Sequence, residues 1–146
     1  MRKYLFISLL FITSTISAQK IQEKAAIKQV IQNMFLAMQT GDTALFRSCF
    51  APSVIFQTIV MKDNQTKVKT EDFVAFLTSM TKYPKGALDE RIKFKSIRED
   101  GTLAIVWTPY QFYYQGKYSH QGVNSFQLVK IDNTWKIQYL IDTRRK

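Results

Sequence analysis

The fold is decided by residues 91–146, RIKFKSIREDGTLAIVWTPYQFYYQGKYSHQGVNSFQLVKIDNTWKIQYLIDTRRK. Apolar and polar residues alternate along this segment in long runs, which is the pattern of β-strands with one buried face. Turn-forming pairs separate the runs at Asp100-Gly101, Gln115-Gly116 and Asp132-Asn133. Because tight turns join antiparallel neighbours, the segment predicts a sheet of consecutive antiparallel strands.

Two-residue loops at these turns would also determine the register of the sheet. They place Leu128 opposite Ile137 and Trp107 opposite Asn124. One face then becomes apolar, and it consists of Ile92, Phe94, Leu103, Ile105, Trp107, Phe126, Leu128, Ile137, Tyr139 and Ile141. Strands of about twelve residues would be some 40 Å long if straight, so the sheet is expected to twist and bend. Pro109 cannot donate to a ladder, which predicts a bulge or an edge at its position.

The residues before the sheet predict helices. Apolar residues recur at three- and four-residue intervals from Ile21 to Met38, which is the period of an amphipathic helix. Gly41 is expected to end this helix. Asp42 can then cap a short second helix through Phe50, because its carboxylate accepts hydrogen bonds from unpaired backbone amides.

A hairpin and a third helix complete the predicted order of elements. Residues 54–61 and 68–69 are typical of a strand and a short return strand. Thr70 is expected to begin a helix with two acidic residues in its first turn, where they favour the helix dipole. The prediction is an α+β fold, in which a cone-shaped, curved antiparallel sheet wraps around three N-terminal helices.

The N-terminal residues indicate a secretory signal peptide over residues 1–18. A basic start at Arg2 and Lys3 leads into an apolar run that is too short to span a bilayer, and Ala18 supplies a small residue at the cleavage site. No cysteine follows the run, so no lipoprotein anchor or other stable membrane anchor is expected. The mature chain, residues 19–146, is expected to be one exported domain in the periplasm or the medium.

Charge and cysteine content exclude several classes of function. The formal net charge is +10 for the whole chain, and it falls to +8 once Arg2 and Lys3 are removed with the signal peptide. The remaining basic residues are scattered, whereas a nucleic-acid-binding protein needs one continuous basic surface, so no nucleic-acid partner is expected. Cys49 has no second cysteine to pair with, and one His with one Cys cannot form a closed zinc site. Neither a metal nor a cofactor is expected.

The order of elements, together with Ser125-Phe126-Gln127-Leu128-Val129-Lys130 and Trp135-Lys136-Ile137, resembles the nuclear-transport-factor-2-like superfamily. That superfamily includes ketosteroid isomerase, scytalone dehydratase and SnoaL-type polyketide cyclases. The resemblance covers the whole mature chain and is strongest to small exported bacterial members of the lumazine-binding-like type, through residues 118–126 and 142–145. It implies the cone fold and a pocket on the concave face, but no single activity.

The predicted register places polar side chains at one open end of this pocket. Glu90, Gln111 and His120 would lie in a row across neighbouring strands, and Asn124 would lie beside Trp107. The proposed ligand-binding set is Glu90, Phe94, Trp107, Gln111, His120, Asn124 and Tyr139. The same register places Asp142 and Arg144 on the face opposite His120, so no His-Asp dyad is predicted unless Gly122 forms a bulge that reverses the register.

Three functions are consistent with this pocket. The preferred prediction is a non-catalytic domain that binds a small, partly aromatic ligand and forms a homodimer through the outer face of the sheet. The alternative is a cofactor-free lyase, isomerase or cyclase with His120 or Glu90 as general acid or base. In that case Gln57 lies near the position where the resemblance implies a carboxylate, and an amide cannot accept the proton. A third possibility is a protein-interaction module that uses the outer face of the sheet.

Overall fold

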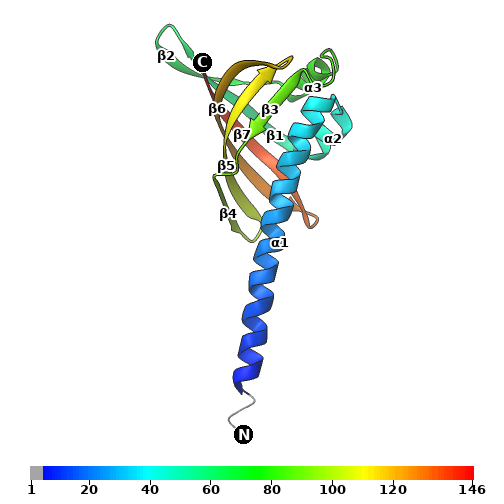
Figure 1. Cartoon of the computed structure of the whole chain (residues 1–146), viewed down its shortest axis with the longest axis vertical. Helices are drawn as coiled ribbons and strands as arrows, with labels where there is room; N and C mark the ends of the chain where they lie inside the picture. Colours follow the sequence, from blue (N-terminus) through cyan, green and yellow to red (C-terminus); the bar gives the residue numbers. More distant parts are fainter. Residues whose placement is uncertain (1–4) are drawn as a thin grey trace.

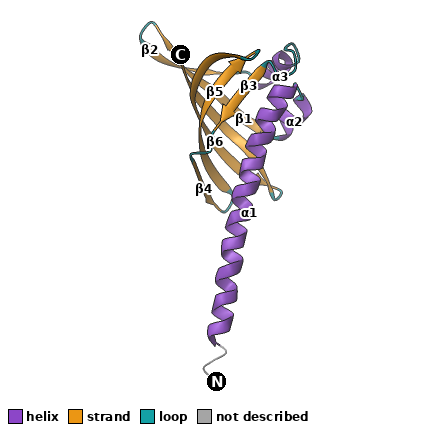
Figure 2. Ribbon diagram, in the orientation of Figure 1, coloured by secondary structure: helices purple, strands orange, loops and turns teal. Residues whose placement is uncertain are grey.

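The computed structural model describes residues 5–146, with side chains from residue 19 onward. Three helices lie against one side of a curved, unclosed sheet (Figures 1 and 2). In chain order the elements are α1 (Leu5–Thr40), α2 (Thr43–Ser48), β1 (Phe50–Lys62), β2 (Gln65–Thr70), α3 (Phe73–Met80), β3 (Leu88–Ile92), β4 (Ser96–Asp100), β5 (Leu103–Tyr114), β6 (Lys117–Ile131) and β7 (Thr134–Arg145). The predicted α+β class and the predicted cone are confirmed.

The helix boundaries follow from local backbone chemistry. Helix α1 ends at Thr40 because Gly41 adopts a φ of +72°, a left-handed conformation that glycine tolerates best. Asp42 caps α2 as predicted, and its Oδ1 accepts a 2.9 Å hydrogen bond from the Leu45 amide. Helix α3 begins later than predicted, because residues up to Thr70 pair with β1 and Asp72 is the residue that caps the helix.

The predicted signal peptide coincides with the first part of α1. Residues 1–4 lie outside the described residues, whereas residues 5–18 are helical and continue directly into the predicted amphipathic helix. This first part of α1 extends away from the sheet, and the second part runs along it (Figure 1). Within the described residues, no helix is both long and apolar enough to cross a membrane. Cleavage after Ala18 stays a prediction.

The sheet has the strand order β2-β1-β7-β6-β5-β3, and β4 also pairs with β5. The pairing of β1 with β7 is parallel, and the other strand pairs of the described residues are antiparallel as predicted. Between β3 and β4, residues 93–95 interrupt the strand that pairs with β5. Pro109 lies at this interruption, where its carbonyl accepts a hydrogen bond from the Lys93 amide at 2.9 Å. The irregularity predicted from Pro109 therefore exists, in the neighbouring strand.

Two bulges change the predicted register. The Asp132-Asn133 turn has positive φ at both residues, and Leu128 lies opposite Ile137 as predicted. Beyond that pair, Gln138 is an extra residue in β7, so Phe126 lies opposite Leu140 and not Tyr139. Each bulge moves every following side chain to the other face of its strand.

The second bulge lies in β6, where Ser119 is the extra residue between the pairs Tyr113–Tyr118 and Phe112–His120. In addition, Asp100 pairs with Leu103, so the first turn consists of Gly101 and Thr102 and not of Asp100 and Gly101. These shifts reverse the predicted orientation of β5.

On β5 the even-numbered residues face the helices. Ala104, Val106, Thr108 and Tyr110 are buried, whereas Leu103, Ile105 and Trp107 are exposed on the outer face of the sheet. The core predicted from alternation is thus right for Phe126, Leu128 and Ile137 and wrong for β5 and for the part of β7 that follows Gln138.

Helix α1 is held on the sheet by a polar contact at one end. The Glu23 carboxylate accepts hydrogen bonds from Lys130 Nζ at 2.6 Å and from Trp135 Nε1 at 2.7 Å. The hydrogen bond from Lys130 and that from Trp135 lower the pKa of Glu23. Elsewhere α1 is packed through buried apolar side chains such as Ile27, Ile31 and Met34. This contact fixes the helix over the concave face.

Gly122 is required where β5, β6 and β7 meet. A Cβ at this position would overlap the Thr143 carbonyl oxygen and lie 2.8 Å from Cε1 of the Tyr110 ring. Because the overlapping atom is backbone, we expect Gly122→Ala to destabilise the fold by about 2 kcal/mol or more. Gln121→Ala, an exposed position on the same strand, is the control. Chemical denaturation of both variants checks this, and equal stability would contradict the packing described here.

Candidate functional site

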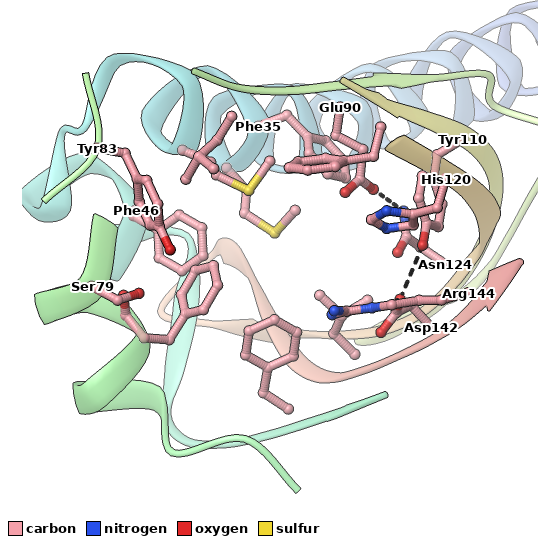
Figure 3. A pocket seen from close by; sticks show the side chains of 17 residues that line it. Phe35, Phe46, Ser79, Tyr83, Glu90, Tyr110, His120, Asn124, Asp142 and Arg144 are labelled. Atoms are coloured by element: carbon pink, nitrogen blue, oxygen red, sulfur yellow. Dashed lines mark hydrogen bonds and ion pairs between the residues drawn. The ribbon is translucent and has the colours of Figure 1, made fainter. Parts of the chain in front are cut away.

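A cavity of about 180 Å³ lies between the helices and the concave face of the sheet (Figure 3). Its wall is mostly apolar, and its polar side chains come chiefly from β3, β5, β6 and β7 at one end. The apolar lining consists of Met34, Phe35, Met38, Phe46, Phe56, Phe76, Leu88, Phe112 and Leu140. The polar lining consists of Ser79, Tyr83, Glu90, Tyr110, His120, Asn124, Asp142 and Arg144. An apolar hollow with a few convergent polar groups is typical of a small-molecule site.

Glu90 and Asn124 form one polar pair in this cavity. Glu90 comes from β3 and Asn124 from β6, and Asn124 Nδ2 donates a 2.7 Å hydrogen bond to Glu90 Oε1. Removal from water raises the pKa of Glu90 to about 7, although the hydrogen bond from Asn124 acts in the opposite direction. The nearby Asp142 charge also raises this pKa. Glu90 can therefore exchange a proton near neutral pH.

Asp142, Tyr110 and Arg144 form a second polar cluster beside the first. Arg144 Nε donates to Asp142 Oδ2 at 3.0 Å. The Tyr110 hydroxyl lies 3.1 Å from Asp142 Oδ2 and 2.9 Å from the Thr143 carbonyl oxygen, so it can donate to either. Burial, and then the Asp142 charge, raise the pKa of Tyr110, which keeps the hydroxyl protonated.

Asp142 carries an unsatisfied atom. The residue is 6% exposed, and its Oδ1 is buried without a hydrogen-bond partner among the described residues. An unsatisfied carboxylate oxygen is costly, and such costs are typical of functional sites.

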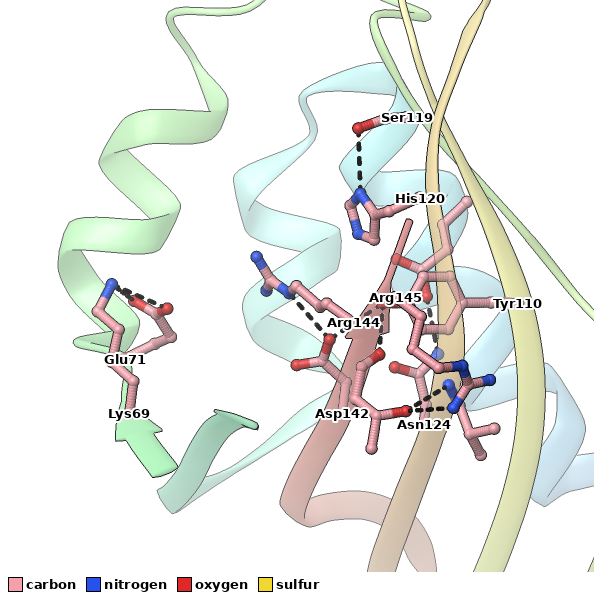
Figure 4. A network of polar contacts seen from close by, with 12 residues as sticks. Lys69, Glu71, Tyr110, Ser119, His120, Asn124, Asp142, Arg144 and Arg145 are labelled. Atoms are coloured by element: carbon pink, nitrogen blue, oxygen red, sulfur yellow. Dashed lines mark hydrogen bonds and ion pairs between the residues drawn. The ribbon is translucent and has the colours of Figure 1, made fainter. Parts of the chain in front are cut away.

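His120 lies on β6 at the rim of the cavity (Figures 3 and 4). Its ring packs against Phe112, with 5.0 Å between ring centroids, and against Tyr110, with 5.8 Å. Nδ1 lies 3.1 Å from the Ser119 hydroxyl. Burial and the Arg144 charge lower the pKa of His120, so the imidazole is neutral at pH 7. A neutral imidazole has one nitrogen that donates a hydrogen bond and one that accepts, and the tautomer decides which is which.

The structure brings together only part of the predicted set. Glu90, His120 and Asn124 line one cavity. The strand pairing differs from the predicted one, because Phe112 and not Gln111 lies between Glu90 and His120. Gln111 pairs with Gln121 and is exposed outside the cavity.

The three predicted aromatic residues do not line the cavity. Trp107 is 46% exposed on the outer face of the sheet. Tyr139 donates a 2.8 Å hydrogen bond to Gln57 Oε1, also away from the cavity, because the Gln138 bulge turns its side chain outward. Phe94 packs against the core with Lys28 Nζ 5.7 Å from its ring centroid. The ring wall comes instead from Phe35, Phe46, Phe56, Phe76 and Phe112.

Three residues of the site were missed by reasoning from the sequence, namely Tyr110, Asp142 and Arg144. Asp142 and Arg144 are two residues apart in the sequence, which predicts that they share one face of the strand, and both do line the cavity. Their face was assigned to the wrong side because nothing in the turn signals reveals the Gln138 bulge. Among the described residues, no group of three or more His, Cys, Asp or Glu is arranged to hold a metal ion.

Comparison with known proteins identifies the family. The model of the SnoaL-like domain matches residues 19–141, so this chain belongs to the SnoaL-like domain family. No curated protein matches the chain.

Solved structures confirm the fold. An NTF2-like protein of unknown function from Shewanella baltica is similar with a TM-score of 0.67 and 16% identity, over 86% of this chain and 96% of that one. A protein with a cystatin-like fold from Nostoc punctiforme has a TM-score of 0.67 and 11% identity, over 84% and 90% of the two chains. A protein provisionally assigned as a scytalone dehydratase, from Novosphingobium aromaticivorans, has a TM-score of 0.68 and 13% identity, over 89% of both chains. At these identities the likeness shows the fold alone.

The raised pKa of Glu90 has a measurable effect on stability. The folded protein binds a proton more tightly at Glu90 than the unfolded chain does, so this group makes folding less favourable as the pH rises from about 4.5 to about 7. Glu90→Gln removes that dependence. As the pH rises from about 4.5 to about 7, we therefore expect the melting temperature of Glu90→Gln to increase relative to that of the wild type. Thermal unfolding across the pH range measures the difference.

The control is Glu99→Gln, because the Glu99 side chain makes no hydrogen bond or ion pair to any described residue and lies outside the cavity. If the difference in melting temperature between wild type and Glu90→Gln stayed constant with pH, the pKa described for Glu90 would be contradicted.

Proposed function

We propose that this SnoaL-like domain binds a small, partly aromatic molecule in the cavity between its helices and its sheet. The observation that carries the proposal is the grouping of four charged or titratable side chains, Glu90, His120, Asp142 and Arg144, at one end of a mostly apolar hollow. The apolar wall favours a ring, and the polar end favours one orientation of it.

The size of the cavity supports a ligand of one or two rings. A dry apolar cavity of about 150 Å³ is large enough to hold benzene, and this cavity measures about 180 Å³. The rings of the wall, including Phe46, Phe56 and Phe76, would contact the faces and edges of an aromatic ligand. Two methionines, Met34 and Met38, adapt easily to its shape.

A second candidate function is proton transfer on the bound molecule, as in a cofactor-free lyase or isomerase. The specific observation is Glu90, a carboxyl group whose pKa of about 7 suits a general base or acid. It would take a proton from a carbon next to a carbonyl group and return it, while a neutral donor such as His120 stabilises the developing oxyanion. Gln57 points away from the cavity and plays no part.

The provisional dehydratase assignment of the Novosphingobium neighbour belongs to the same class of chemistry. That assignment concerns the neighbour, and it is a reason to test this chain for lyase activity.

One pair of measurements distinguishes binding from catalysis. Native mass spectrometry of protein purified from its own host is expected to show a retained small molecule. With that molecule as ligand, His120→Ala and Glu90→Gln should weaken binding by about tenfold if the protein is a binder, because each removes one polar contact. If it is an enzyme, turnover should fall by about a hundredfold or more in Glu90→Gln. Glu99→Gln is the control for both.

A cavity filled by ordered side chains in an experimental structure, with no retained molecule, would contradict both functions. An interaction module would then be the remaining candidate.

Export and dimerisation are parts of the same proposal. The basic start, the apolar run and Ala18 support export to the periplasm or the medium. The outer face exposes Leu103, Ile105 and Trp107, and a second copy of the chain would cover them. We expect a dimer in analytical ultracentrifugation and a monomer for Trp107→Glu. A wild-type monomer at high micromolar concentration would contradict the dimer.

A further inference from the structure

Arg144 is the one cationic side chain in the cavity lining of the described residues. Its Nε donates to Asp142 Oδ2 at 3.0 Å, and this contact fixes one edge of the guanidinium. The two Nη atoms make no hydrogen bond to the described residues, and the guanidinium reaches into the cavity (Figure 3). The side chain is 45% exposed, so a ligand can reach this second edge.

The anchored position of Arg144 suits the recognition of an acid. A guanidinium presents pairs of N–H donors in a rigid plane that matches the two oxygens of a carboxylate. Because Asp142 already holds the Nε edge, the Nη edge keeps a fixed direction and loses little side-chain entropy on binding. A lysine at this position would supply charge without that planar match.

On the side of the outer groove, the surroundings of Arg144 also favour an anion. His120 and Arg144 are shared with a shallow groove outside the cavity, which is also lined by Val60, Met61, Ser119, Arg145 and Lys146 and by no acidic residue. Arg145 and Lys146 therefore add positive charge at the cavity mouth and would attract anions toward it. Glu90, whose pKa is about 7, is largely uncharged below neutral pH and then does not repel an anion.

The other end of the cavity carries no charge. Between the polar end and the helices the wall consists of phenylalanine, methionine and leucine side chains, with Ser79 and Tyr83 at the far side. A ligand with one charged end and an apolar ring body would match both ends. A doubly charged or wholly apolar ligand would leave one of them unsatisfied.

We propose that the ligand is a monocarboxylic acid with a body of one or two rings, whose carboxylate binds the Nη edge of Arg144 while the rings lie against Phe46, Phe56 and Phe76. This inference rests on the proposed binding function and names the class of its ligand.

The test compares acids with their neutral amides of the same shape. Benzoate, 2-naphthoate, benzamide and 2-naphthamide are titrated into the full chain by calorimetry or by ligand-observed NMR. Wild type is expected to bind at least one acid about tenfold or more tightly than its amide, since a hydrogen bond to a charged group is worth about that factor. Arg144→Gln should abolish this preference while leaving the affinity for the amide unchanged. Unchanged amide binding also shows that the variant is folded.

Arg145→Gln is the matched control, because Arg145 lines the outer groove and not the cavity. It should keep the preference for the acid, with at most a slower association. Arg144→Lys is expected to retain part of the preference through charge alone.

Each outcome decides the inference. If the amides bind as well as the acids, or if Arg144→Gln keeps the preference, the acid class is wrong and the small-molecule pocket still stands. If Arg145→Gln loses as much of the preference for the acid as Arg144→Gln does, the acid binds in the outer groove, which also overturns the inference. If none of the four compounds binds, the inference fails, and the retained molecule in native mass spectrometry decides the proposed function separately.

Discussion

A single extra residue in each of two neighbouring strands decides which side chains face the cavity. Ser119 in β6 and Gln138 in β7 are those residues, and each reverses the alternation of the strand from that point onward. The Ser119 bulge shifts β5 against β6 by one residue, so Tyr110 and Phe112 face the same side as the core residues Phe126 and Leu128. The Gln138 bulge brings Asp142 and Arg144 to that side as well. Without the bulges, Asp142 and Arg144 would point into solvent and Trp107 would point inward.

The bulges also allow one sheet to carry two environments. Toward the turn at residues 132–133, the concave face is apolar and packs on α1, with Leu128 and Ile137 fully buried. Beyond Gln138, the same face supplies polar groups, and their burial is compensated by specific partners such as Asn124 for Glu90. Asp142 is an exception, since one of its oxygens stays unsatisfied among the described residues, as do the hydroxyl groups of Thr58 and Thr108. Such a local cost is typical of a site that is built to meet a ligand or a reacting group.

Much of the fold could be predicted from the sequence, because each signal was local. Asp42 caps a helix, Gly41 ends one, and the Asp132-Asn133 turn sets the nearest pairs in register. The alternation in β5 was assigned to the wrong face because both sides contain large apolar residues, such as Trp107 on one side and Tyr110 on the other. A strand of this composition gives no preference for either face, and only a bulge in its partner decides between them. The polar residues of β3 and β6 were found because Glu90, His120 and Asn124 are unusual on a strand face, whereas Asp142 and Arg144 followed a bulge that leaves no mark in the sequence.

The polar end of the cavity requires His120 to face inward between Tyr110 and Phe112. The chain has one histidine, so its ring protons are unambiguous in an NMR spectrum. Nuclear Overhauser contacts from the imidazole of the mature protein test this orientation most directly. The structure predicts contacts to the ring protons of Tyr110 and Phe112. Contacts to the side chain of Gln111 instead, with none to these two rings, would show that the β6 bulge is absent and would contradict this arrangement of the site.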